Sequence, residues 1–185
     1  MANLIYSALT SLDGFVADEA GNFDWAAPDE EVHAFVNDLE RSAGTYLFGR
    51  RMYAVMAAWE SDDIVVGQPP FIADYAAIWR AAEKIVYSRS LESVSTARTR
   101  IERVFDSDAI RSMKAGAARD LTIGGPELAA EALRAGLVDE VRLFLNPIVI
   151  GRGNPALPND IRIPLHLVDE HRFGNGVVYL RYRVA

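Results

Sequence analysis

The sequence predicts an α/β fold in which helices flank a central, mostly parallel sheet and the C-terminal strands are antiparallel. Strand-like and helix-like apolar stretches alternate along most of the chain, as they do in strand–helix–strand units. Glycine and proline stand at the ends of these stretches, where they interrupt regular structure. Helical spacing is missing from the last ~25 residues, which therefore predict an antiparallel pair of strands.

Length and composition fit one globular domain over residues 1–185. Half of the residues are hydrophobic, which is enough for a sizeable core. The chain has no cysteine, so disulfides, thiolate metal sites and a cysteine nucleophile are excluded, and a reducing cytoplasm suits it.

The charge balance argues against two classes of partner. The formal net charge is −7, so we expect no basic face for nucleic acid or for an anionic membrane. No apolar run approaches the ~20 residues that span a bilayer, and we expect no membrane segment. The N-terminal residues carry no basic region, so we expect no secretory peptide.

The first predicted elements are two strands and two helices. Residues 4–9 form an apolar run typical of a buried strand. Residues 29–43 carry apolar side chains at helical spacing, with a proline before them and a glycine after them. This apolar face consists of Val32, Phe35, Val36 and Leu39. Residues 45–48 predict a second strand, and residues 50–58 predict a second helix.

The middle of the chain predicts a loop, two helices and two strands. Residues 60–70 contain one glycine and two prolines and predict the loop. The helix that follows has a buried face of Phe71, Ile72, Tyr75, Ile78 and Trp79. Residues 84–87 and 100–105 predict strands. Asp106 or Ser107 can cap the next helix, because short polar side chains satisfy free N–H groups.

The last third predicts two more strands, a helix and a hairpin. Residues 121–123 form a short buried strand that leads into a helix closed by Gly136. The apolar run over residues 138–150 predicts a long central strand, although Asn146-Pro147 interrupts it. Residues 152–160 are rich in glycine, proline and asparagine and predict a loop. The hairpin has strands over residues 165–173 and 177–184 and a turn at residues 174–176.

Three strand ends carry residues suited to an anionic ligand. Gly124-Gly125-Pro126-Glu127 follows a buried strand and opens a helix, whose free N–H groups and dipole favour a pyrophosphate. A strand end with a glycine also precedes a helix at Phe48-Gly49-Arg50-Arg51, which adds two guanidinium groups. The third strand end, Tyr87-Ser88-Arg89, carries a hydroxyl group and one more guanidinium group. Ligands bind along the carboxyl edge of open α/β sheets, so we expect the three turns to form one site. Taken singly, each turn is also compatible with a structural role.

The carboxylates allow more than one interpretation. Asp13 follows the first strand and precedes Gly14, so it either faces a cleft or forms an Asx-turn. Asp29, Glu30 and Glu31 begin a helix, where acidic residues stabilise the helix dipole without any further role, and that interpretation is the stronger one.

Other kinds of site are not supported. The run from Gly151 to Ala156 matches a loose dinucleotide pattern, but Pro155 and Pro158 prevent the helix that this pattern must open. The three histidines have no metal-binding spacing, so we expect no metal. No G-x-S-x-G motif is present to anchor a hydrolase triad.

Six motifs in a specific order and spacing cover nearly the whole chain. They are Ser11-Leu12-Asp13-Gly14-Phe15, Phe48–Tyr53, Tyr87-Ser88-Arg89, Ile123–Leu128, Ala135–Glu140 and Pro147–Gly153. With these motifs the chain resembles the dihydrofolate-reductase-like superfamily. The resemblance is strongest to the C-terminal reductase domain of bifunctional riboflavin-biosynthesis proteins and its stand-alone bacterial relatives.

The resemblance implies a three-layer fold, an NADPH cofactor and a homodimer. The residues that it implies for the cofactor are Gly49, Arg50, Arg51, Ser88, Arg89, Gly124, Gly125, Pro126 and Glu127. Among these, Ser88 and Arg89 would lie near the adenosine 2′-phosphate. Met52 and Asn146-Pro147 differ from the usual residues of dihydrofolate reductases, so the resemblance does not imply folate as the substrate.

We therefore expect an NADPH-dependent reductase of a small heterocyclic (pteridine- or pyrimidine-like) or carbonyl substrate. Asp13 or Glu30, or water ordered by either, would supply the proton. Trp25 and Tyr53 would line the substrate pocket, although a role in the core is equally compatible with both. A non-catalytic nucleotide-binding module is the alternative, and a flavin-dependent protein is a weaker one.

Overall fold

The computed structural model describes all 185 residues and contains an eight-stranded sheet with the order β5-β4-β3-β6-β1-β7-β10-β9. Its strands are β1 (Leu4–Ser11), β3 (Ala43–Gly49), β4 (Glu83–Tyr87), β5 (Thr99–Glu102), β6 (Asp120–Gly124), β7 (Glu140–Asn146), β9 (Leu165–Arg172) and β10 (Val178–Val184). The six strands from β5 to β7 are parallel, whereas β10 is antiparallel to both of its neighbours. The predicted fold class and the C-terminal hairpin are therefore confirmed.

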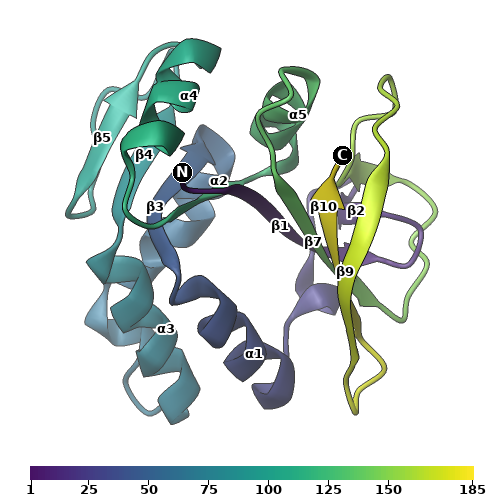
Figure 1. The fold of residues 1–185 in the computed structure, drawn as a ribbon. Coiled ribbons are helices and arrows are strands. Elements are labelled where there is room, and N and C mark those ends of the chain that lie inside the picture. Colours follow the sequence, from purple (N-terminus) through teal and green to yellow (C-terminus); the bar gives the residue numbers. More distant parts are fainter.

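Helices cover both faces of the sheet and give three layers. They are α1 (Glu30–Glu40), α2 (Arg50–Met56), α3 (Pro70–Ala81), α4 (Ser107–Gly116) and α5 (Pro126–Arg134), with short 3-10 turns η1 (Asp24–Ala26), η2 (Ala57–Glu60) and η3 (Asp62–Ile64). In Figure 1, α4 and α5 lie on one side of the sheet and α1 and α3 lie on the other. None of the helices has the length and apolar character that crossing a membrane requires.

The core is divided by the sheet. One large cluster lies on the α5 side and contains Leu4, Tyr6 and Leu47 of the strands and Ala129 of the helix. Two smaller clusters lie on the side of α1, α2 and α3. The ring of Phe35, on the predicted apolar face of α1, makes edge contacts in one of these clusters. Helical periodicity in the sequence thus reports which side chains pack on the sheet.

Helix α1 begins one residue later than predicted and ends three residues earlier. The side chain of Asp29 accepts a hydrogen bond from the N–H of Val32 and caps the helix, so Asp29 itself lies outside it. The helix ends at Glu40, and strand β3 already begins at Ala43.

The long strand predicted over residues 138–150 is shorter in the structure. Strand β7 ends at Asn146, because Pro147 has no N–H to donate to a neighbouring strand. The residues beyond it turn toward the N-terminal part of the chain. There β8 (Gly153–Pro155), in a segment predicted to be a loop, pairs antiparallel with β2 (Phe15–Asp18) in a separate small sheet.

Glycine is required at position 153 of this small sheet. A Cβ atom there would lie 2.0 Å from the carbonyl oxygen of Ala17, which is far inside van der Waals contact. The backbones of β2 and β8 can approach each other only because residue 153 has no side chain.

Candidate functional site

The three predicted turns lie side by side at one edge of the sheet. Strands β4, β3 and β6 are neighbours and run parallel, so their carboxyl ends point the same way. The register pairs Gly49 with Tyr87 and Phe48 with Gly124. The residues that follow these strands therefore form one continuous rim, and the predicted convergence of the turns is confirmed.

The Gly124-Gly125 turn brings β6 into close contact with α2. Gly125 has a φ of 94°, which favours glycine. A Cβ atom on Gly124 would lie 2.9 Å from the ring of Phe48, and one on Gly125 would lie 3.3 Å from Cβ of Met52. Helix α5 then begins at Pro126 and has no side-chain cap, so its first N–H groups are available to an anion.

Arginines and hydroxyl groups line the rest of this rim. Arg51 pairs with the carboxylate of Glu127 at 2.8 Å, which connects the beginnings of α2 and α5 at the surface. Arg50 donates a hydrogen bond to the hydroxyl of Ser90 at 3.2 Å. Arg89 is exposed, and its guanidinium has no hydrogen-bond or ion-pair partner in the structure. The rim thus has one guanidinium without a partner, that of Arg89, and one held only by a hydroxyl, that of Arg50, and both could bind an anion.

A fourth arginine, which sequence reasoning missed, holds the turn after β4. Arg103 follows β5, and its Nη1 donates hydrogen bonds to the carbonyl oxygens of Ser88 at 3.0 Å and Leu91 at 2.6 Å. The hydroxyl of Ser88 accepts the N–H groups of Ser90 and Leu91 within the same turn. Nothing local in the sequence distinguishes Arg103 from the other arginines, because its role depends on the pairing of β4 with β5.

Asp13 connects two loops at the far end of the rim. Its carboxylate accepts hydrogen bonds from the N–H of Ile150 at 3.2 Å and the N–H of Gly151 at 2.7 Å. The hydrogen bond from the Ser11 hydroxyl, followed by those from Gly151 and Ile150, lowers the pKa of Asp13. An ionised carboxylate occupied in this way is poorly suited to proton donation. These contacts fit the structural role that was one of the two interpretations of Asp13, and its part in proton supply stays a prediction.

The three acidic residues around the start of α1 have different surroundings. Asp29 is occupied by capping the helix. Glu31 accepts a hydrogen bond from the N–H of Gly174 at 2.9 Å, in the turn between β9 and β10. Glu30 is exposed and accepts no hydrogen bond in the structure. It is the one carboxylate of the three that has no hydrogen-bond partner within the protein.

The two predicted aromatic residues also differ. Trp25 lies in η1 and is half-buried, and its Nε1 has no hydrogen-bond partner. Tyr53 is only 5% exposed and packs in the core. Its hydroxyl accepts the N–H of Ser95 at 2.9 Å and lies 3.1 Å from Oγ1 of Thr96. Tyr53 therefore has the core role that was one of its two interpretations, because the ring and the hydroxyl are both used within the protein.

No group of three potential metal-ligating side chains gathers anywhere in the 185 residues. The buried histidine, His33, lies among the rings of Trp59, Phe71 and Tyr75, and burial lowers its pKa. It takes part in the packing of α1 against α3 rather than in the rim.

Known proteins share this architecture. The family model described as RibD C-terminal domain matches residues 2–179. The uncharacterized protein YyaP of Bacillus subtilis (strain 168) is 28% identical over 97% of this chain and 93% of its own length. The solved structure of a putative riboflavin biosynthesis protein from Shewanella sp. PV-4 superposes with a TM-score of 0.76 at 21% identity, covering 100% of this chain and 99% of that one.

Two further structures extend this comparison. A pyrimidine reductase-like protein from Corynebacterium diphtheriae has a TM-score of 0.70 at 15% identity, covering 100% of this chain and 92% of that one. A diaminohydroxyphosphoribosylaminopyrimidine deaminase/5-amino-6-(5-phosphoribosylamino)uracil reductase from Thermotoga maritima has a TM-score of 0.68 at 16% identity. This chain is covered completely in that match but spans only 57% of the Thermotoga protein.

Proposed function

This chain belongs to the RibD C-terminal domain family, and on that premise we propose that it is an NADPH-dependent reductase. Its substrate would be a small heterocyclic compound of the pteridine or pyrimidine kind, or a small carbonyl compound. The observation that carries the proposal is the shared rim of the three turns after β3, β4 and β6. That rim combines free helix N–H groups with exposed arginines, which is the donor set that a phosphorylated dinucleotide requires.

The cofactor would lie along this rim. The N–H groups at the start of α5 would hold the pyrophosphate, and Gly49 and Arg50 would approach it from the neighbouring turn. Ser88 and Arg89 would bind the adenosine 2′-phosphate, with Arg103 fixing the turn that carries them. When bound, NADPH supplies a hydride from its nicotinamide ring.

The residues around the start of α1 would serve the substrate. We propose that Glu30, directly or through an ordered water, supplies the proton that must accompany the hydride. The half-buried Trp25, in the turn before α1, would provide an apolar wall. Asp13 would fix the neighbouring loops and would not exchange the proton itself.

Cofactor titration tests the proposal. We expect the purified protein to bind NADPH more tightly than NADH. The Arg89→Ala variant should reduce that preference at least 10-fold, because it removes a charge-assisted contact to the 2′-phosphate. Arg162→Ala is the matched control, since Arg162 is also exposed and unpaired but follows the small sheet on another part of the surface. No NADPH binding at millimolar cofactor would end the proposal.

A non-catalytic nucleotide-binding module is the second candidate, and the occupation of Asp13 by backbone amides favours it. It would bind the same cofactor and reduce nothing. NADPH oxidation measured across pteridines, pyrimidines, flavins and small carbonyls separates the two candidates. Binding without turnover on any of them would favour the module.

A further inference from the structure

The charges of this chain are unevenly distributed along the sequence. The first 40 residues contain nine Asp and Glu residues and no Lys or Arg. The other 145 residues contain 17 acidic and 19 basic residues. The whole negative excess of the protein therefore resides in β1, β2, η1 and α1, the segment that borders the proposed substrate half of the site.

Most of these acidic groups lie at the carboxyl edge of the sheet. Strand β1 ends there, and α1 begins there, because α1 must return to the opposite edge where β3 starts. Seven carboxylates belong to the connection between β1 and the first turn of α1. They are Asp13, Asp18, Glu19, Asp24, Asp29, Glu30 and Glu31. All are exposed except Asp18, which is half-buried.

Their charges are not balanced by neighbouring cations. None of the seven takes part in a salt bridge. Those that are hydrogen-bonded use neutral donors: backbone N–H groups and a hydroxyl for Asp13, and backbone and amide N–H groups for Asp18. Neutral donors fix the position of a carboxylate without removing its charge, so the negative potential remains.

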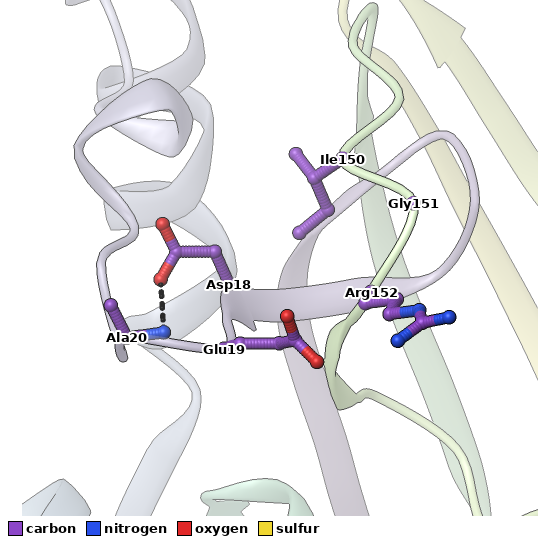
Figure 2. Close-up of a pocket in the computed structure, with 6 residues that line it drawn as sticks. All are labelled: Asp18, Glu19, Ala20, Ile150, Gly151 and Arg152. Atoms are coloured by element: carbon purple, nitrogen blue, oxygen red, sulfur yellow. Dashed lines mark hydrogen bonds between the residues drawn. The ribbon is translucent and has the colours of Figure 1, made fainter.

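One arginine lies within this acidic region. Arg152 lines a pocket of about 470 Å³ together with Asp18, Glu19, Ala20, Ile150 and Gly151 (Figure 2). Two carboxylates and one guanidinium give this pocket a formal charge of −1. Arg172, at the end of β9, points away from α1. Its neighbour His171 stacks on Phe35 of α1, and successive side chains of a strand alternate between the two faces.

The cofactor half of the rim has the opposite character. Arg50, Arg51, Arg89 and Arg103 are all exposed just after β3, β4 and β5, and only Arg51 is paired with a carboxylate. The rim therefore presents four exposed arginines at the adenosine end, whereas acidic residues without cationic partners gather at the substrate end.

From this polarity we infer that the acceptor substrate is neutral or cationic and carries no phosphate group. The inference rests on the proposed function and adds the charge of its substrate. A phosphate at the substrate end would meet several carboxylates that have no cationic partner, and one arginine, Arg152, that shares its pocket with two of them. The Thermotoga relative is a 5-amino-6-(5-phosphoribosylamino)uracil reductase, so this chain would differ from it in substrate charge.

Collisional quenching of bound NADPH measures the potential at the substrate end without knowledge of the substrate. Iodide is the anionic quencher and caesium the cationic one, each referred to its quenching of free NADPH. Binding to the protein should lower the quenching constant of NADPH for iodide at least 5-fold more than its quenching constant for caesium. Neutralising two carboxylates outside the proposed catalytic set, with Glu19→Gln and Asp24→Asn, should raise the iodide constant at least 2-fold.

A matched double variant is Asp63→Asn with Glu131→Gln, which removes two exposed charges elsewhere and should leave both constants unchanged. Equal protection from the two quenchers, or stronger protection from caesium, would overturn the inference. Absence of NADPH binding would instead refute the proposed function. In that case the quenching of Trp25 fluorescence by iodide and caesium measures the same potential in a Trp59→Phe variant. Trp25 is then the tryptophan that the quenchers reach, because Trp79 is 0% exposed.

A matched pair of substrates tests the same inference through turnover. The pair is 5-amino-6-ribosylaminouracil and its 5′-phosphate. We expect kcat/KM to be at least 10-fold higher for the unphosphorylated compound, with the difference shrinking as salt screens the carboxylates. A preference for the phosphorylated compound would overturn the inference. If neither compound is reduced, the quenching result decides.

Discussion

Asp13 holds two loops together with one carboxylate, and its lowered pKa gives this contact a definite pH dependence. A carboxyl group whose pKa is lower in the folded than in the unfolded protein stabilises the fold at pH values above its unfolded pKa. This stabilisation is lost as the pH falls through the pKa of the folded protein. We expect Asp13→Asn to unfold at lower denaturant concentration than the wild type at pH 7. This difference should shrink as the pH falls below the ordinary carboxyl pKa of about 3.9 and through the lower folded value. A difference that stays the same over this pH range would show that the charge of Asp13 does not matter.

Glu30 is the residue whose replacement should affect chemistry rather than stability. We expect Glu30→Gln to lower kcat for NADPH oxidation by about 10²-fold, the usual effect of removing a general acid, with the Kd for NADPH unchanged. Glu31→Gln is the control, because Glu31 lies next to it in the same helical turn but accepts the N–H of Gly174. Equal losses of kcat in both variants would contradict a specific role for Glu30.

Single residues show where sequence reasoning reaches its limit. The alternation of strand-like and helix-like stretches predicted that Gly49, Ser88 and Gly124 lie at the same edge of the sheet, because the carboxyl ends of parallel strands are aligned. The partners of individual side chains could not be predicted in this way. Tyr53 and Asp13 bind backbone groups 42 and more than 130 residues distant, and no local pattern reports such contacts.

The small sheet of β2 and β8 is the element that depends most on one glycine. We expect Gly153→Ala to lower the free energy of unfolding by about 2–4 kcal/mol, because the new Cβ would separate the two strands. Gly116→Ala is the matched control. Gly116 ends helix α4 with open space around it, and alanine there should be neutral or stabilise by up to about 1 kcal/mol. Thermal unfolding of both variants checks the pair, and equal midpoints would contradict the expected clash.

Elements with a strong local pattern were predicted well, and elements defined by distant partners were not. The amphipathic α1 and the β9–β10 hairpin follow from spacing and from a glycine-rich turn. Strands β2 and β8 lie 135 or more positions apart and have only four and three residues, respectively, so neither shows a period of its own. Strand β7 ends before Pro147. In the sequence this end is hard to recognise, because apolar residues continue on both sides of the proline.

At the scale of the whole molecule, the end of the sheet at β9 is open. All eight residues of β9 are exposed, and Leu167 is 56% exposed. On the face away from α1, Leu180 and Tyr182 of β10 are only half-buried. A stable dimer buries about 800 Å² per subunit, so the interface would have to extend over β9, β10 and their adjoining loops. We propose that a second copy of the chain covers this face.

Sedimentation velocity tests the homodimer. We expect the wild type to sediment as a dimer and Leu167→Glu to sediment as a monomer, because a carboxylate would be buried without a partner. Val104→Glu is the control, since Val104 is 72% exposed but follows β5 at the opposite end of the sheet. A monomeric wild type, or a Leu167→Glu variant that remains dimeric, would contradict this interface.

The position of β1 has a consequence for the synthesis of the protein. This strand is synthesised before both of its neighbours, and it lies in the middle of the sheet between β6 and β7, where Leu4 pairs with Leu121 and Ile5 with Glu140. At the usual rate of translation its partners emerge roughly ten seconds later. During that interval this apolar strand has no native neighbour, so we expect it to be open to non-native contacts until residue 146 has been synthesised.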